Sequence, residues 1–183
     1  GHSGRRTSQP YLAILACWQA ALSGDTDVAL HVAECLDIAE PGPPQVRAQA
    51  LALRSALCRD GIDTMTLDAE LALSIEPPSS VARPGALTTL GEAHLAAGRT
   101  DDGISLIGQA VQLARYPDNS LSLILGLADL AWFAMDRNDW SSAPESASRA
   151  VDLVDRSGTT EAIPALFVDL ASARLDLHRG DRD

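Results

Sequence analysis

The fold is decided by residues 90–110, which read LGEAHLAAGRTDDGISLIGQA. Gly98 predicts the end of a first helix, because glycine adopts the left-handed conformation after a helix without a steric penalty. Thr100 predicts the N-cap of a second helix, and Asp101 and Asp102 are favoured in the positive first turn of that helix. The stretch therefore predicts two helices joined by a tight turn.

Small residues indicate that these two helices lie close together. Gly91 belongs to the first helix, and Gly103 and Ala110 belong to the second. Side chains of this size let helix backbones approach each other, while Leu90 and Ile107 fill the space between them. We therefore expect one antiparallel helical hairpin.

The turn recurs along the chain, which is the signature of a helical-repeat protein. Its markers are Gly24, Gly61, Gly98, Asn138 and Gly180, at steps of 37, 37, 40 and 42 residues. Proline-containing breaks fall between the expected hairpins, whereas the glycine or Asn-Asp turns fall within them. This alternation predicts four hairpins and one further helix, about nine helices in all, in place of a single closed bundle.

The expected elements form one domain over residues 10–183. Residues 1–9 are polar and expected to be disordered, and residues 1–3 are consistent with the remnant of a tag. A fifth helix follows the break at 77–80 and ends at 97, and an eighth helix has a capping box of Ser142 and Glu145. The other helices are expected at about 10–23, 25–40, 44–60, 63–76, 101–115, 120–137 and 160–178. The last helix has no hairpin partner, so we expect the chain to be a fragment of a longer protein.

The repeat resembles the tetratricopeptide pattern, in which leucine-glycine, an aromatic residue, glycine and two alanines stand at fixed offsets. The matching positions of the third hairpin are Leu90, Gly91, His94, Gly98, Gly103 and Ala110. The matching positions of the fourth are Leu130, Ala131, Asn138, Trp140, Ala143 and Ala150. The second hairpin fits poorly, because Arg54 and Thr66 stand where small residues are usual.

The period near 40 and the phrase LGEAHLAAG are also similar to the superhelical sensor region of MalT-type ATPase regulators of the LuxR family. The resemblance implies an all-α fold of tetratricopeptide-like hairpins stacked into a right-handed α-solenoid. It also implies a cytoplasmic bacterial protein of signalling or transcription regulation. Its parent would carry an ATPase module and a DNA-binding domain, or a serine/threonine kinase domain.

Composition restricts the functions open to this segment. The formal net charge of −11 argues against direct nucleic-acid binding, which needs a basic face. All 14 basic residues are arginine, so a lysine-containing phosphate loop is impossible, and no other catalytic motif is present. The most apolar run, residues 121–135, is too short to span a membrane. We expect no cofactor and no catalysis, and a single His31–Glu34 pair predicts no metal site.

The three cysteines, Cys17, Cys35 and Cys58, all fall inside expected helices. An odd number without metal-ligand spacing predicts reduced, buried thiols. A Cys17–Cys35 bridge across the first hairpin is the alternative.

The first helices of stacked hairpins line a concave face, where a peptide, a small effector or another domain can bind. The groove-facing positions are Tyr11, Trp18, Arg59, Glu92, Trp132, Asp136, Phe167, Arg174 and His178. Aromatic and arginine side chains are common anchors of binding surfaces. The alternative is that Trp18 and Trp132 only fill seams between hairpins. Trp140 is expected to pack within its hairpin, and His94 to be a hydrogen-bonded core or seam residue.

Two functions follow from this pattern. The first is a non-catalytic regulatory module that binds an effector, a partner protein or neighbouring domains of its parent through the concave face. The second is a structural oligomerisation segment, in which exposed apolar edges of the outer hairpins join chains.

Overall fold

A computed structural model describes residues 4–25, 27–29, 31 and 43–180, and this part of the chain contains helices and no strand. The helices are α1 (Gly4–Leu22), α3 (Pro44–Leu57), α4 (Ile62–Ile75), α5 (Arg83–Ala96), α6 (Thr100–Leu113), α7 (Ser120–Asp136), α8 (Ala143–Ser157) and α9 (Ile163–Arg179). The all-helical prediction is confirmed. The helix expected at 25–40 lies mostly outside the described residues.

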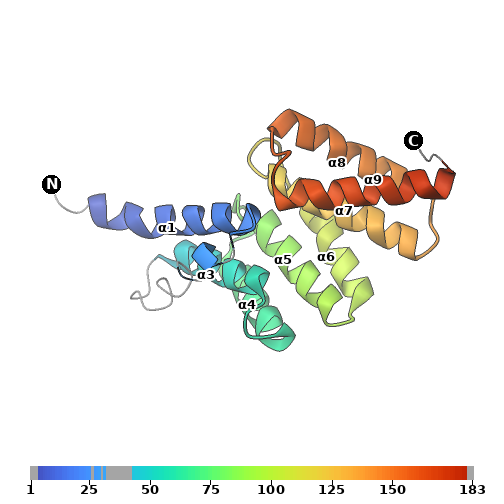
Figure 1. Ribbon diagram of the computed structural model, residues 1–183. Coiled ribbons are helices and arrows are strands. Elements are labelled where there is room, and N and C mark those ends of the chain that lie inside the picture. Colours follow the sequence, from blue (N-terminus) through green and yellow to red (C-terminus); the bar gives the residue numbers. More distant parts are fainter. Residues whose placement is uncertain (1–3, 26, 30, 32–42, 181–183) are drawn as a thin grey trace.

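The helices pack in the order of the sequence. Helices α3 and α4, α5 and α6, and α7 and α8 form pairs, and each pair contacts the next through α4 and α5, α6 and α7, and α8 and α9. The first helices of successive pairs also touch, from α1 through α3, α5 and α7 to α9. Figure 1 shows the pairs following one another from α1 to α9. The buried side chains accordingly form several local clusters along the chain.

All five turn markers have positive φ, which glycine and asparagine accept more readily than other residues. Gly24, Gly61, Gly98 and Gly180 have φ between +77° and +87°, and Asn138 has φ of +59°. Gly61 differs from the prediction in its role: it is the N-cap of α4 with ψ of 172°, and the left-handed residue after α3 is Cys58. The turn positions were therefore correctly predicted from local chemistry alone.

The close approach of α5 and α6 is also confirmed. A Cβ atom at Gly91 would lie 2.6 Å from Ile107 Cγ1, and one at Gly103 would lie 2.8 Å from the carbonyl oxygen of Gly91. Ile107 and Ala110 are fully buried, and Leu90 is 6% exposed. The two backbones meet where the glycines leave room.

Several helix boundaries differ from the prediction. Helix α1 begins at Gly4 and not at Pro10, so residues 4–9, expected to be disordered, are helical. Strong helix formers among them, including two arginines and a glutamine, favour this extension. Helix α9 begins only at Ile163, after residue 162 in an extended conformation.

Two predicted caps are wrong. Thr100 is the first residue of α6 and not its N-cap, and its side chain makes no capping hydrogen bond. The box of Ser142 and Glu145 does not form, because the Asp139 carboxylate instead accepts hydrogen bonds from the backbone and hydroxyl groups of Ser141 and Ser142. The aspartate thus closes the turn before α8, and Ser142 stands at the N-cap without a capping hydrogen bond.

The cysteines fit the prediction only in part. Cys17 is buried, and its Sγ donates a hydrogen bond to the carbonyl oxygen of Ala29 at 2.9 Å. Cys58 is exposed, because α3 ends at Leu57 and Cys58 follows in a left-handed conformation with φ of +46°. Cys35, and with it the alternative bridge, lies outside the described residues.

Arg54 explains how the atypical second hairpin packs. Its guanidinium group forms two hydrogen bonds with the Asp68 carboxylate across α3 and α4, one of them 2.7 Å from Nε to Oδ2. Next to it, the buried Ser55 hydroxyl donates to the carbonyl oxygen of Met65 at 2.8 Å. A partly buried ion pair thus stands where small side chains were expected.

Candidate binding surface

Helices α7 and α9 bring together four of the residues that the sequence places in the groove. These are Trp132, Asp136, Arg174 and His178, and Trp140 joins them from the turn after α7. We call these five residues the Trp132–Arg174 cluster. Spacings of four residues place Trp132 and Asp136 on one face of α7, and Arg174 and His178 on one face of α9.

Arg174 contacts three of the other four residues of the cluster or their rings. Its NH1 atom lies 2.7 Å from Asp136 Oδ1, and its guanidinium carbon lies 4.8 Å from the centre of the Trp132 ring. The Trp140 ring centre is 5.9 Å away, and Trp140 itself stacks on His178 with ring centres 3.5 Å apart. A cation is thus held between a carboxylate and indole rings, which stabilises it through both charge and ring quadrupole.

Trp140 has a second role beyond its predicted one. It packs with Trp132 against the buried cluster of α7, α8 and α9, which includes Ala131, Met135 and Ala143. The expected packing inside the hairpin is therefore present. By stacking on His178, Trp140 also becomes part of the candidate binding surface. The sequence did not predict this role for Trp140.

A second feature adjoins the cluster: two carboxyl groups at the contact of α5 and α7. Burial raises the pKa of Glu92, and the charge of Asp129 raises it further, to about 8. Burial likewise raises the pKa of Asp129, to about 7. Among the described residues, neither carboxyl group forms a hydrogen bond or an ion pair. We call Glu92 and Asp129 the acidic pair.

Two polar side-chain atoms on α7, one of them from the acidic pair, have no hydrogen-bond partner within the described ranges. Asp129 Oδ2 and Trp132 Nε1 are both shielded from solvent, and neither has a hydrogen-bond partner in the described part of the chain. Most buried polar groups in proteins are hydrogen-bonded. The position of Asp129, which interrupts the most apolar run of the sequence one helical turn before Trp132, is the signal that could have revealed it.

The remaining groove predictions do not converge on this place. Trp18 packs against Leu51, Ala52 and Ala72 and fills a seam, as the alternative interpretation proposed. Arg59 is exposed in the turn after α3. Phe167 is 42% exposed near the start of α9, and the side chain of Tyr11 lies outside the description. Of the nine predicted groove positions, four thus come together, and all four lie on α7 and α9.

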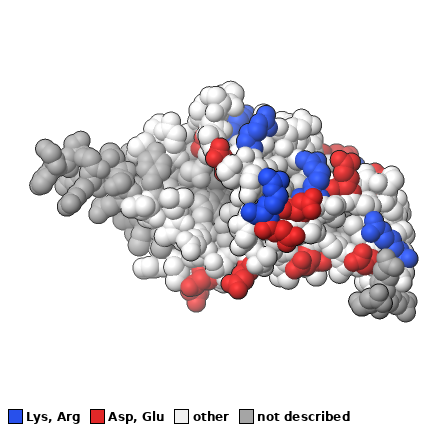
Figure 2. Space-filling view, turned by 90° about the horizontal axis from the view of Figure 1, so that it is seen from above, with Lys and Arg blue, Asp and Glu red and all other residues white. Residues whose placement is uncertain are grey.

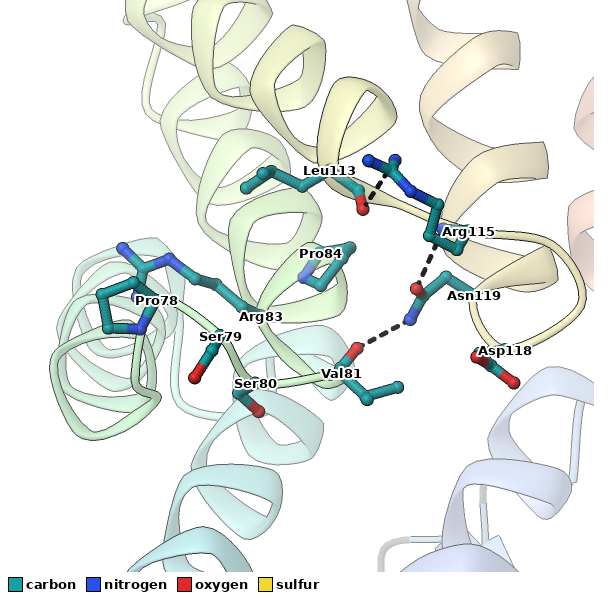
Figure 3. Close-up of a pocket in the computed structure, with 10 residues that line it drawn as sticks. All are labelled: Pro78, Ser79, Ser80, Val81, Arg83, Pro84, Leu113, Arg115, Asp118 and Asn119. Atoms are coloured by element: carbon teal, nitrogen blue, oxygen red, sulfur yellow. Dashed lines mark hydrogen bonds between the residues drawn. The ribbon is translucent and has the colours of Figure 1, made fainter.

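A small hollow between the loops before α5 and before α7 is shown in Figure 3. Its volume of about 190 Å³ is below the usual ~300–1,000 Å³ of ligand pockets. Its polar side chains serve the fold: Arg83 donates to the carbonyl oxygen of Glu76, and Asn119 donates to that of Val81 at 2.7 Å. We therefore regard it as a junction between hairpins.

Charged side chains of both signs mix on the surface. Figure 2 shows arginine next to aspartate and glutamate on the face seen from above. Two ion pairs, Arg137–Asp101 and Arg174–Asp136, join neighbouring elements in this way. The view offers no extended basic patch of the kind that phosphate backbones require.

Other predictions for titratable residues have mixed outcomes. Both ring nitrogens of His94 are shielded from solvent and have no hydrogen-bond partner in the described chain. The prediction that His94 is hydrogen-bonded is therefore wrong. Glu34 of the His31–Glu34 pair lies outside the description. In the described ranges, no group of three or more His, Cys, Asp or Glu side chains is arranged to hold a metal ion.

No described helix has the length and apolar character needed to cross a membrane. No family model, curated protein or solved structure matches the chain. The function must therefore be inferred from the residues of the site.

Proposed function

We propose that this chain is a non-catalytic binding and regulatory module, built from tetratricopeptide-like hairpins stacked into a right-handed α-solenoid. The contacts between successive first helices support this arrangement, since such contacts form the inner wall of a solenoid. The observation that carries the proposal is the Trp132–Arg174 cluster, which brings two indole rings, an imidazole, a guanidinium group and a carboxylate together on α7, α9 and the turn after α7.

The partner in this proposal is an effector, a protein, or a neighbouring domain of a bacterial signalling or transcription-regulatory parent in the cytoplasm. A partner that contacts α5, α7 and α9 together binds best at one angle between the hairpins. It therefore shifts the population of hairpin arrangements toward that angle. A neighbouring ATPase or kinase module that senses the angle would be regulated by this shift, as linkage requires.

Calorimetric titration of this chain with the domains encoded beside it tests the proposal. Trp132→Ala should weaken binding at least ten-fold, because a central indole anchor is commonly worth about 2 kcal/mol or more. Trp18→Ala is the matched control, since Trp18 fills a seam and should change stability but not affinity. Equal binding by wild type and Trp132→Ala would contradict the proposed surface.

An oligomerisation segment is the second candidate, and one observation favours it. Helix α9 presents a stripe of exposed apolar side chains, at Ile163, Leu166, Phe167, Leu170 and Leu177, with exposures between 37% and 68%. Such a stripe can be covered by another chain. Light scattering distinguishes the two functions: a monomer at high concentration removes this one, whereas a dimer lost in Leu166→Glu supports it.

A further inference from the structure

We infer that the acidic pair, together with Trp132, receives the cationic group of an arginine or lysine side chain from a partner polypeptide. This inference rests on the proposed binding function and names the chemistry of the partner. The site lies where α5 and α7 meet, next to the Trp132–Arg174 cluster.

The first argument is the lack of a counter-charge. The charge of Asp129 acts on Glu92, and both side chains are half-buried. Buried charges in proteins are normally paired. On the helices that contact α5 and α7, Arg54 pairs with Asp68 of α4 and Arg174 pairs with Asp136 of α7. Among the described residues, no ion pair involves Glu92 or Asp129.

The second argument comes from two unpartnered atoms of different kinds. Asp129 Oδ2 is an acceptor and Trp132 Nε1 is a donor, and both are shielded from solvent one turn apart on α7. An arginine or lysine side chain supplies N–H donors for the carboxylate, and the backbone of the same polypeptide supplies carbonyl acceptors for an indole N–H. A peptide can thus satisfy both atoms, which a lone proton cannot do.

The third argument is that the molecule already contains the arrangement we propose. Arg174 lies over the Trp132 ring and pairs with Asp136, which is a cation between an indole and a carboxylate. An incoming basic side chain would meet the same two kinds of group at Asp129 and Trp132. The net charge of −11 also favours approach by a basic partner.

In the free chain, a proton on the pair takes the place of the missing cation. The raised pKa values of both carboxyl groups mean that the pair retains a proton near neutral pH. The arriving cation favours the ionised carboxylates, so this proton is released to solvent on binding. Binding should therefore strengthen as the pH rises from 6 to 8, with net proton release.

The test uses the whole chain and two short peptides, acetyl-Gly-Gly-Arg-Gly-Gly-amide and the same peptide with citrulline in place of arginine. Citrulline keeps the shape of arginine but carries no charge. Titration is followed by the indole N–H resonance of Trp132 and by calorimetry in buffers of different ionisation enthalpy. We expect the arginine peptide to shift the Trp132 resonance and release protons, and the citrulline peptide to bind at least ten-fold more weakly.

The variants Glu92→Gln and Asp129→Asn should each weaken binding of the arginine peptide at least ten-fold. Asp169 is an exposed acid on α9, and Asp169→Asn should leave this binding unchanged. Equal binding of the two peptides, or no Trp132 shift at millimolar arginine peptide, would overturn the inference whether or not a variant folds. Tighter binding of free putrescine than of the peptide would overturn the polypeptide source. If partner domains still need Trp132 but bind Glu92→Gln normally, the inference fails while the proposed function stands.

Discussion

Gly103→Ala is the sharpest test of how the helices pack. An added Cβ would lie 2.8 Å from the carbonyl oxygen of Gly91 and 2.7 Å from Leu95 Cγ. The side chain of Leu95 can rotate, but the carbonyl belongs to the backbone of α5, so the two helices must separate. Gly108→Ala is the matched control, because it lies on the same helix and its Cβ would meet nothing within 4 Å.

The expected magnitudes follow from two opposing effects. Overpacking against backbone costs up to ~3 kcal/mol, and replacing glycine by alanine inside a helix gains about 1 kcal/mol. Gly103→Ala should therefore lose roughly 2 kcal/mol of unfolding free energy, which lowers Tm by about 4–8 °C in a domain of this size. Gly108→Ala should gain ~1 kcal/mol and raise Tm by about 2–4 °C.

Thermal and urea unfolding followed by far-ultraviolet circular dichroism measure both variants. The Tm and unfolding free energy of the wild type should lie between those of the variants, with higher values for Gly108→Ala and lower values for Gly103→Ala. If Gly103→Ala is as stable as Gly108→Ala, the backbones of α5 and α6 are not in contact at this point. The packing argument for the central hairpin would then be wrong.

Three further predictions concern charges and strain. The pKa values of Glu92 and Asp129 are higher in the folded chain than in the unfolded chain, so folding stability should fall as the pH rises from about 4.5 to 8. The Tm of Glu92→Gln, measured by thermal unfolding, should depend less on pH than the Tm of the wild type. Arg54→Met should cost roughly 2–3 kcal/mol in urea unfolding, because it leaves Asp68 buried without this partner; an unchanged midpoint would contradict this. Cys58→Gly should gain about 1 kcal/mol in the same assay by relieving a left-handed non-glycine residue.

The sequence predicted what depends on local chemistry. The turn at Gly98 follows from the freedom of glycine at positive φ, and the contact of Gly91 with Gly103 follows from side-chain size at helical spacing. Neither depends on distant residues. The caps were harder to predict, because the Ser142 hydroxyl donates to Asp139 in the turn before α8 and makes no capping hydrogen bond.

The binding surface was predicted less completely, because it depends on how the hairpins are placed against one another. Trp132 and Arg174 are 42 residues apart in sequence, and their contact requires the specific rotation of α9 against α7. Trp18 has the same residue type and a comparable helical position, yet it fills a seam. Asp129 was overlooked as a site residue because a single acid in an apolar run gives no periodic signal.

Residues 91–93 show how one stretch can determine both the fold and the site. Successive residues of a helix point about 100° apart, so three neighbours in sequence face three different directions. Gly91 meets α6, Ala93 packs in the cluster with Met65 and Ala69 of α4, and Glu92 interacts with Asp129 of α7. The first two contacts bury apolar or small groups and stabilise the hairpins. The third places an unpaired acid in the same packed environment, where a neutral residue would be more stable. The inferred basic partner would supply the counter-charge that the fold does not give this acid.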